Sequence, residues 1–410
     1  MRSRFRQAGM SLVEVLVAAA VGLVVALAVT TAIVSSSRQF TIIGGTAAAQ
    51  SSVQVGLSLL DQGGRAAGAG FYSNALPICP TWNAYNGTAI KSDGEPFMPV
   101  RITAGATARD SDTIVFSGGG GAGTRPLAAA PVLAPVLAAG ADINIPVSGG
   151  FAVGDYAVIG APGSGQPCTL FEVRNLVATP AGCPGVAIEC QQVVRTPNEG
   201  INPGPVAFAQ RPNFGFETSP APVVHGPAVI SRVGSRETGF RQDAFTVACQ
   251  SLVRYNAFDF VPPAGDWCST SPLSFAGGLD AIAGDVVLLQ AQYGVSSAAT
   301  PTSNIVAEWV DPSDAAWSGT PAVDDIARIK AVRVVMVSRS REPAGEEVSA
   351  PCTNGAGVVN QGPCSFEDAR APVVDLSAVP VPAGRSWRNF RYRAHTAVIP
   401  LRAVIWSGSS

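Results

Sequence analysis

The sequence contains little charge and very little histidine. Only 14% of its 410 residues are charged, and the formal net charge is -2 at pH 7. It has no concentrated basic patch of the kind that binds nucleic acid. Its two histidines, His225 and His395, lie far apart, and no two of its eight cysteines have CxxC spacing, so the ligand pattern of a zinc site is missing. We expect no metal site, no cofactor and no direct nucleic-acid site.

The motifs of nucleotide binding and catalysis are incomplete. Gly118, Gly120 and Gly123 have GxGxxG spacing, but a proline-broken run follows where a phosphate-binding helix should begin. The glycine-rich segment 160–166 ends in Gln166, where a phosphate loop would carry lysine. The sequence contains no GxSxG motif, and neither histidine has a recognisable partner motif. We therefore expect that the protein is not an enzyme and has no catalytic residues.

Two further sets of side chains allow a binding interpretation and a structural one. Clustered carboxylates attract calcium, but the acidic clusters of this sequence lack EF-hand spacing. Acidic residues are also common in turns because of their own hydrogen bonding. Exposed aromatic residues bind partners or glycans, although most of them cover a core or a subunit contact. The carboxylates are Asp311, Asp314, Asp324 and Asp325, and the aromatic residues are Trp82, Tyr85, Trp309 and Trp317.

The N-terminal part carries one long apolar stretch. No charged residue occurs between Val15 and Ser37, and about 20 apolar residues are enough for a helix to cross a membrane. The stretch is longer than the core of about 7 to 15 residues in a secretory signal peptide. Arg2, Arg4 and Arg6 precede it, so the positive-inside rule orients the N-terminus towards the cytoplasm and the remainder of the chain towards the periplasm.

A single acid, Glu14, lies near the start of this stretch. A carboxylate inside a membrane helix costs about 2.5–3.5 kcal/mol, so it normally has a partner and a function. A structural alternative is that Glu14 reaches the headgroups beside an ordinary membrane anchor. The apolar residues expected to span the membrane or pack on neighbouring helices are Leu12, Val13, Val15, Leu16, Val17, Gly22, Leu23, Leu27 and Ile33.

The spacing of Gly9, Met10 and Glu14 resembles that of the type IV prepilin family. In that family a peptidase cuts the leader after a glycine, and the fifth mature residue is a glutamate. The resemblance implies a leader over residues 1–9 and a mature protein that starts at Met10. It also implies that Glu14 pairs with the amino terminus of a neighbouring subunit and sets the axial register of a filament.

The helical pattern continues beyond the apolar stretch and predicts a spine over residues 10–62. Val53, Leu57 and Leu60 form one apolar stripe, which we expect to pack on the head. Gly44 and Gly45 predict a kink or a melted turn. The glycine cluster that begins at Gly63 and Gly64 predicts the end of the helix.

Residues 63–410 predict a β-rich head, and the whole chain therefore an α+β fold with an antiparallel sheet. The strand-like runs, rich in Val, Ile and aromatic residues, are 113–116, 156–159, 170–173, 286–290, 332–337 and 396–401. Gly- and Pro-rich insertions are expected as loops near 118–150 and 203–227. A division into two subdomains near 220–240 is an alternative to a single head.

Several segments resemble PilW-like minor pilins. They are the turn 65–68 after the long helix, the strand 111–116, the turn 151–156, the segment 284–295, the strand 331–339 and the closing segment 392–402. Ala403 departs from the family pattern, where asparagine is usual. The resemblance implies a minor pilin that helps to initiate pilus assembly in a tip complex, with roles in twitching motility, adhesion and DNA uptake. Implied partners are other minor pilins, the major pilin, the inner-membrane assembly platform, the prepilin peptidase and a tip adhesin.

Two other functions remain open from the sequence. A minor pseudopilin J of a type II secretion system shares the N-terminal features and a related head. The head is longer than either family requires, so the insertions also allow a ligand-binding or adhesion module at a filament tip.

The eight cysteines are an even number in a compartment where disulfides persist. Proximity in sequence favours pairing Cys183 with Cys190, Cys249 with Cys268 and Cys352 with Cys364, which leaves Cys79 for Cys168. Eight cysteines allow 105 pairings, so the sequence does not fix the connectivity.

Overall fold

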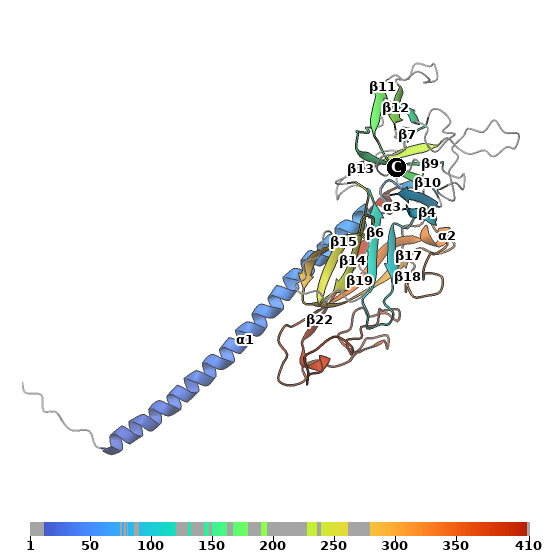
Figure 1. The fold of residues 1–410 in the computed structure, drawn as a ribbon. Helices are drawn as coiled ribbons and strands as arrows, with labels where there is room; N and C mark the ends of the chain where they lie inside the picture. The colour runs from blue at the N-terminus through green and yellow to red at the C-terminus, as the bar shows by residue number, and fades with distance from the viewer. Residues whose placement is uncertain are drawn as a thin grey trace, which may run out of the picture.

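The structure is a long helix that carries a β-rich head at its C-terminal end (Figure 1). The computed structural model describes residues 12–73, 76–77, 79, 81–85, 90–119, 130–132, 143–146, 150–161, 167–178, 190–194, 228–235, 239–260 and 279–407. Within these residues the predicted α+β fold is confirmed, with an N-terminal helix followed by several sheets.

Helix α1 spans Leu12–Ala66 without interruption. Its 55 residues correspond to a rod of roughly 83 Å at 1.5 Å per residue. Of the kink or melted turn predicted at Gly44 and Gly45, the melted turn is wrong, because the helix continues through both. The predicted end at residue 62 is also wrong, since Gly63 and Gly64 belong to the last turn. A glycine costs a helix only about 1 kcal/mol, so packing on the head can outweigh it.

Two antiparallel sheets pack around the C-terminal part of α1, and we call this unit the basal lobe. The first has the strand order β16-β15-β14-β6-β5, and the second has the order β18-β17-β19-β22. The strands of the first are β5 (Val100–Thr103), β6 (Thr113–Gly118), β14 (Arg241–Ala248), β15 (Ser251–Asn256) and β16 (Leu279–Gly284). Those of the second are β17 (Val286–Val295), β18 (Glu308–Val310), β19 (Ile329–Arg339) and β22 (Tyr392–Pro400).

The apolar stripe of α1 enters the core between these sheets. Val53 and Leu60 are fully buried, and Leu57 packs against the same cluster, so the prediction that this stripe packs on the head is confirmed. The helix contacts β16 and β6 of one sheet and β19 and β22 of the other. The spine and the basal lobe therefore share one hydrophobic core.

A second unit, the distal lobe, lies at the end of the head farthest from the start of α1 (Figure 1). Its larger sheet has the order β4-β3-β10-β9-β13-β7 and its smaller sheet the order β11-β12-β8. The strands are β3 (Thr81–Tyr85), β4 (Ile90–Pro96), β7 (Ala130–Pro131), β8 (Ile143–Pro146), β9 (Asp155–Gly160), β10 (Cys168–Glu172), β11 (Asn175–Ala178), β12 (Cys190–Val194) and β13 (Val229–Ser235). A separate core, which includes Ile145, Phe171 and Ile230, lies between the two distal sheets. The other face of the larger sheet, with Trp82 and Leu170, belongs to the same core as the basal lobe.

The distal lobe is largely an excursion between two neighbouring strands. Gly118 at the end of β6 pairs directly with Arg241 at the start of β14, so the chain leaves the basal lobe after one and re-enters it at the other. The expectation of a loop over 118–150 needs correction, because β7 and β8 lie within it. Residues 203–227 lie outside the described part of the chain. No single cut near 220–240 separates the lobes, since β3 and β4 also belong to the distal sheet.

The segment between β19 and β22, which we call the C-terminal excursion, covers the other face of the second basal sheet. It contains β20 (Cys352–Thr353), β21 (Val359–Asn360) and the 3-10 helix η2 (Trp387–Asn389). Val374, Leu376 and Trp387 pack there against Leu288, Val335 and Val337. The remaining short elements are β1 (Tyr72–Ser73), β2 (Leu76–Pro77), α2 (Val323–Ile326) and α3 (Arg402–Trp406).

Disulfides join Cys79 to Cys168 and Cys352 to Cys364. Both pairs are among the pairings that the sequence favours. Cys249 is also disulfide-bonded. Cys183 and Cys268 lie outside the described residues, as does the side chain of Cys190, so the expected partners of these three cysteines stay predictions.

Candidate assembly interface

The first 22 residues of α1 form an apolar surface that no described part of the chain covers. Leu12–Ile33 has a mean hydropathy of 2.8 with none of it buried. Its length of roughly 33 Å matches a bilayer core. Apart from Gly22, each residue expected to face lipid or another helix is more than half exposed: Leu12, Val13, Val15, Leu16, Val17, Leu23, Leu27 and Ile33. A surface of this kind requires lipid or other apolar helices around it.

Polar side chains in this segment are compatible with an apolar environment. The Thr30 hydroxyl donates to the carbonyl of Ala26 at 2.9 Å, and the Thr31 hydroxyl donates to the carbonyl of Ala28 at 2.8 Å. A hydroxyl that is bonded to its own helix avoids the cost of an unsatisfied polar group in lipid. These threonines therefore do not argue against burial of the segment.

Glu14 lies in the first turn of α1 with its side chain exposed. A carboxylate is favourable there, because the backbone N–H groups at a helix N-terminus carry partial positive charge. Gly9 and Met10 lie outside the described residues. The structure therefore gives the place of the acid on the helix but not that of the processing site.

Gly22 leaves a small notch in the same surface. A Cβ built at this position meets no atom within 4 Å, so the isolated chain does not need glycine there. Small residues in a membrane helix allow another helix to approach closely. Gly22 thus fits the sequence-based expectation of a helix contact between subunits.

The other end of α1 is fixed to the head by glycines that do touch their neighbours. A Cβ at Gly63 would lie 2.8 Å from the Phe116 ring, and one at Gly64 would overlap Ile399. These close approaches explain why glycine and not a larger residue occupies both positions, where the last turn of the helix packs on the head. Beyond the helix, Gly68 has a φ of +83°, a conformation that glycine adopts without strain.

The turn after α1 then joins both lobes. The Gly68 N–H donates to the Ser117 carbonyl at 2.8 Å, which attaches the turn to β6. Three residues later Phe71 stacks on Phe97 with ring centroids 3.8 Å apart. Rotation of the helix relative to the head would break these contacts, so the spine is held in a defined direction.

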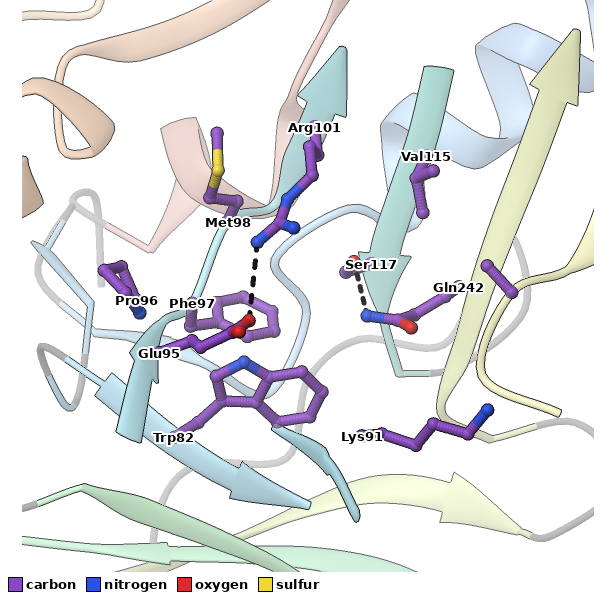
Figure 2. Close-up of a pocket in the computed structure, with 11 residues that line it drawn as sticks. Trp82, Lys91, Glu95, Pro96, Phe97, Met98, Arg101, Val115, Ser117 and Gln242 are labelled. Atoms are coloured by element: carbon purple, nitrogen blue, oxygen red, sulfur yellow. Dashed lines mark hydrogen bonds and ion pairs between the residues drawn. The ribbon is translucent and has the colours of Figure 1, made fainter. Parts of the chain in front are cut away.

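A small pocket of about 170 Å³ opens where the two lobes meet (Figure 2). Trp82 and Phe97 form its apolar base, with Lys91, Glu95 and Arg101 around it. Arg101 and Glu95 form a loose ion pair at 3.8 Å, and both are partly exposed. This lining combines apolar contact with opposite charges, and it places no histidine or cysteine in the pocket.

The two histidines were the candidates for catalysis, and the structure describes one of them. His395 on β22 lies 3.2 Å from the Ser338 hydroxyl, and burial together with Arg393 lowers the pKa of its imidazole. His225 lies outside the described residues. Among the described residues there is no group of three or more His, Cys, Asp or Glu residues suited to a metal ion.

Several of the acidic and aromatic candidates also take part in local structure, and the side chain of Tyr85 lies outside the described residues. Asp311 accepts a hydrogen bond from the Ser313 N–H at 2.9 Å, as in an Asx turn, and Asp325 pairs with Arg328 at 2.8 Å. Trp82 and Trp317 are buried in the main core. The structural interpretation therefore accounts for these side chains.

Sequence reasoning missed the role of Arg333, which is buried although it carries charge. Its guanidinium donates two hydrogen bonds to Asp368, at 2.5 and 3.1 Å, and one to Gln292 at 2.8 Å. It also lies over the rings of Trp309 and Phe366. This residue fastens the C-terminal excursion to the second basal sheet. The sequence feature that could have indicated this role is the single arginine inside the otherwise apolar run 331–337.

Two regions of the chain match known protein families. Residues 275–403 match the family described as "Type IV Pilus-assembly protein W", and residues 4–30 match the "Prokaryotic N-terminal methylation motif". The first region contains β16 to β22, which belong to the basal lobe and the C-terminal excursion, and the second contains the start of α1. No curated protein and no solved structure matches the chain.

Proposed function

We propose that this chain, a PilW-like type IV pilin, is a minor subunit that helps to initiate pilus assembly in a tip complex. One observation carries the proposal: the exposed apolar segment Leu12–Ile33 and the C-terminal part of α1, which is buried in the head from Val53 onward, belong to one continuous helix. The apolar segment provides a surface for other helices. The C-terminal part transmits the position of that surface to the head.

Charge pairing at the start of the helix is the proposed source of axial register. After cleavage behind Gly9, Met10 would carry a new positive amino terminus, four residues before Glu14. In the family, a glutamate at this position pairs with the amino terminus of a neighbouring subunit. Burial in an apolar bundle strengthens such a pair and makes either charge costly without the other.

The same features support a location in the inner membrane before assembly and in the filament afterwards. The membrane anchor and the pilus association follow from the apolar helix and the methylation motif. The leader with Arg2, Arg4 and Arg6 supports a cytoplasmic N-terminus and a periplasmic head. The proposed partners are the prepilin peptidase, the inner-membrane assembly platform, the major pilin, other minor pilins and a tip adhesin.

The test is the N-terminal mass of the protein from cells with and without the prepilin peptidase. We expect a methylated N-terminus at Met10 in the wild type, and an intact leader both without the peptidase and in Gly9→Ala. Glu14→Gln keeps the length of the side chain, and we expect processing to continue while recovery with other pilins falls. An intact leader in the wild type would contradict the proposal.

A second candidate function, a binding module at the filament tip, is favoured by the distal lobe. Part of this lobe packs around a core of its own. The lobe lies far from the start of α1 (Figure 1), at a position where a ligand surface would be accessible. An antibody fragment against the distal lobe separates the roles. Blocked adhesion with normal piliation supports binding, and unchanged adhesion removes this candidate.

A minor pseudopilin J-like subunit of a type II secretion system remains the alternative assembly role. It would use the same helix and the same processing site. Deletion of the gene distinguishes the two systems, because loss of pili with normal protein secretion supports the pilus subunit. Loss of secretion with normal pili would support the pseudopilin.

A further inference from the structure

Strand β22 is the longest edge strand among the described sheets. It has nine residues and pairs with β19 along one side, and it ends the order β18-β17-β19-β22. An unpaired edge presents a row of N–H and C=O groups that another chain can pair with, and proteins usually shorten or block such edges. The length of β22 therefore raises the question of what pairs with it.

The register shows which backbone groups of β22 point away from β19. The Leu401 N–H donates to the Lys330 carbonyl, and the Ser340 N–H donates to the Arg391 carbonyl. In an antiparallel pair the hydrogen-bonded residues alternate with residues whose groups point outward. Odd-numbered residues from 391 to 401 thus face β19, and the outward groups belong to Ala394, Thr396 and Val398 in the middle of the strand.

Pro400 supports this assignment independently. Its residue number is even, like those of Thr396 and Val398, so its backbone nitrogen also points away from β19. Proline lacks the N–H that a paired residue would donate. Prolines occur in sheets mainly at edge positions where the missing N–H faces away from the neighbouring strand. Pro400 also limits the open edge at its C-terminal end.

The faces of β22 are covered differently from its edge. Ile399 and Ala397 pack on the core side, where α1 lies, and Tyr392 and Ala394 pack under the C-terminal excursion. Thr396 and Val398 are exposed, Val398 by 54%. The outward backbone groups of Ala394, Thr396 and Val398 form no hydrogen bond with any described residue. We call residues 394–398 the open edge.

Charge at one end of the open edge indicates the chemistry of its partner. Arg391 and Arg393 are exposed, and neither forms an ion pair within the described residues. The open edge itself, Ala-His-Thr-Ala-Val, carries no acid or permanent cation. An extended segment with an acidic side chain near the arginines would satisfy both the backbone and the charges.

We propose that the open edge of β22 binds an extended, acidic segment of a second pilin subunit as an added strand. The inference rests on the proposed assembly role, because that role requires contacts between heads as well as between helices. Pairing would use the outward N–H and C=O groups of Ala394, Thr396 and Val398. Arg391 and Arg393 would fix the direction of the added segment.

Amide hydrogen exchange tests the proposal on the full-length chain in detergent, alone and in complexes recovered with co-expressed pilins. Alone, the amides of Thr396 and Val398 exchange much faster than those of His395 and Ala397, which face β19. In the complexes we expect the exchange of Thr396 and Val398 to slow by about tenfold or more. Unchanged rates in complexes that do form would overturn the proposal, and so would protection by lipid alone.

A matched pair of variants removes or keeps one outward donor. Thr396→Pro deletes an N–H that β19 does not use, and Thr396→Val keeps it in a side chain of similar shape. We expect both to be processed at Gly9, with about tenfold lower recovery of other pilins only for the proline variant. Normal recovery with Thr396→Pro would refute the edge contact while leaving the assembly role intact. If even the wild type recovers no pilins, the proposed function itself fails.

Discussion

At the residue scale, two glycines of α1 have opposite surroundings and should respond differently to alanine. A Cβ at Gly64 overlaps Ile399, whose branched side chain is stiff, whereas a Cβ at Gly22 meets nothing. We expect Gly64→Ala to lower the free energy of unfolding of the head by about 1–2 kcal/mol, because overpacking exceeds the gain in helix propensity. Denaturant unfolding measures this effect.

Gly22→Ala is the control for this prediction. It should leave the unfolding of the head unchanged and reduce recovery with other pilins, if helices approach closely at this position. Combining Gly64→Ala with Ile399→Leu moves the branch away from Cβ and should recover part of the lost stability. Equal unfolding of Gly64→Ala and the wild type would show that the contact relaxes without cost.

Asp112 is a buried carboxyl group that should make stability depend on pH. Its oxygens accept hydrogen bonds from the N–H groups of Gly105 at 2.9 Å and Ala291 at 2.7 Å. Burial nevertheless raises the pKa of Asp112 to about 7, and nearby Asp311 adds to the shift. A pKa raised in the folded state means that the contribution is largest below about pH 4 and is lost as the pH rises towards 7.

The corresponding variant is Asp112→Asn, which cannot titrate. We expect its free energy of unfolding to be lower than that of the wild type by about 1–3 kcal/mol, because the amide NH2 faces a backbone N–H donor. Its stability should fall less between pH 5 and pH 7.5 than that of the wild type. Parallel pH profiles for the two proteins would show that Asp112 is already ionised at low pH.

At the scale of elements, Arg333 connects the C-terminal excursion to the sheet beneath it. Its side chain is only 2% exposed, while Asp368 is 46% exposed. We expect Arg333→Met to cost about 2–4 kcal/mol, less than a fully buried pair would because solvent reaches Asp368. Limited proteolysis should then cut within residues 340–391.

An exposed ion pair in the same lobe provides the control. Arg341 is 74% exposed and pairs with Asp285 at 2.9 Å, and surface pairs contribute about 0–1 kcal/mol. Arg341→Met should therefore leave both unfolding and proteolysis close to wild type. Similar cleavage in the two variants would mean that the excursion is held by its apolar contacts and disulfide alone.

Elements with strong local patterns could be predicted from the sequence. All six predicted strand runs lie largely within observed strands, because β-branched and aromatic residues are concentrated there. The stripe of Val53, Leu57 and Leu60 follows from helical periodicity alone. The predicted end of α1 at Gly63 and Gly64 was wrong because distant residues decide it. The last turn packs on Phe116 and Ile399 and stays helical, although local propensity predicts a stop.

The functional residues also divide into those that the sequence reveals and those that only the folded chain reveals. Gly9, Met10 and Glu14 are visible in sequence because their spacing is local. The open edge of β22 depends on its register with β19 and on which strand ends the sheet, and neither is encoded in residues 394–398 themselves. Arg333 meets Asp368 from 35 residues away, so only the folded chain reveals its role.

At the scale of the whole molecule, one helix serves two environments, and truncation should separate them. Leu12–Ile33 is not buried at all, whereas Val53 and Leu60 are completely buried in the head. Removing residues 1–37 should therefore yield a soluble head that unfolds at the same denaturant concentration as the full-length chain in mild detergent. Its disulfides should form as before, since α1 contains no cysteine.

Removing residues 1–61 should instead unfold the head. It deletes the fully buried Val53 and Leu60 and the partly buried Leu57. A buried leucine alone contributes about 2–5 kcal/mol, and the total stability of a domain is about 5–15 kcal/mol. The empty groove between the two basal sheets would expose Phe116, Met336 and Ile399 and favour aggregation. If both truncated chains unfold alike, the helix is only an attachment, and the position of the head would no longer follow from the position of the helix in a filament.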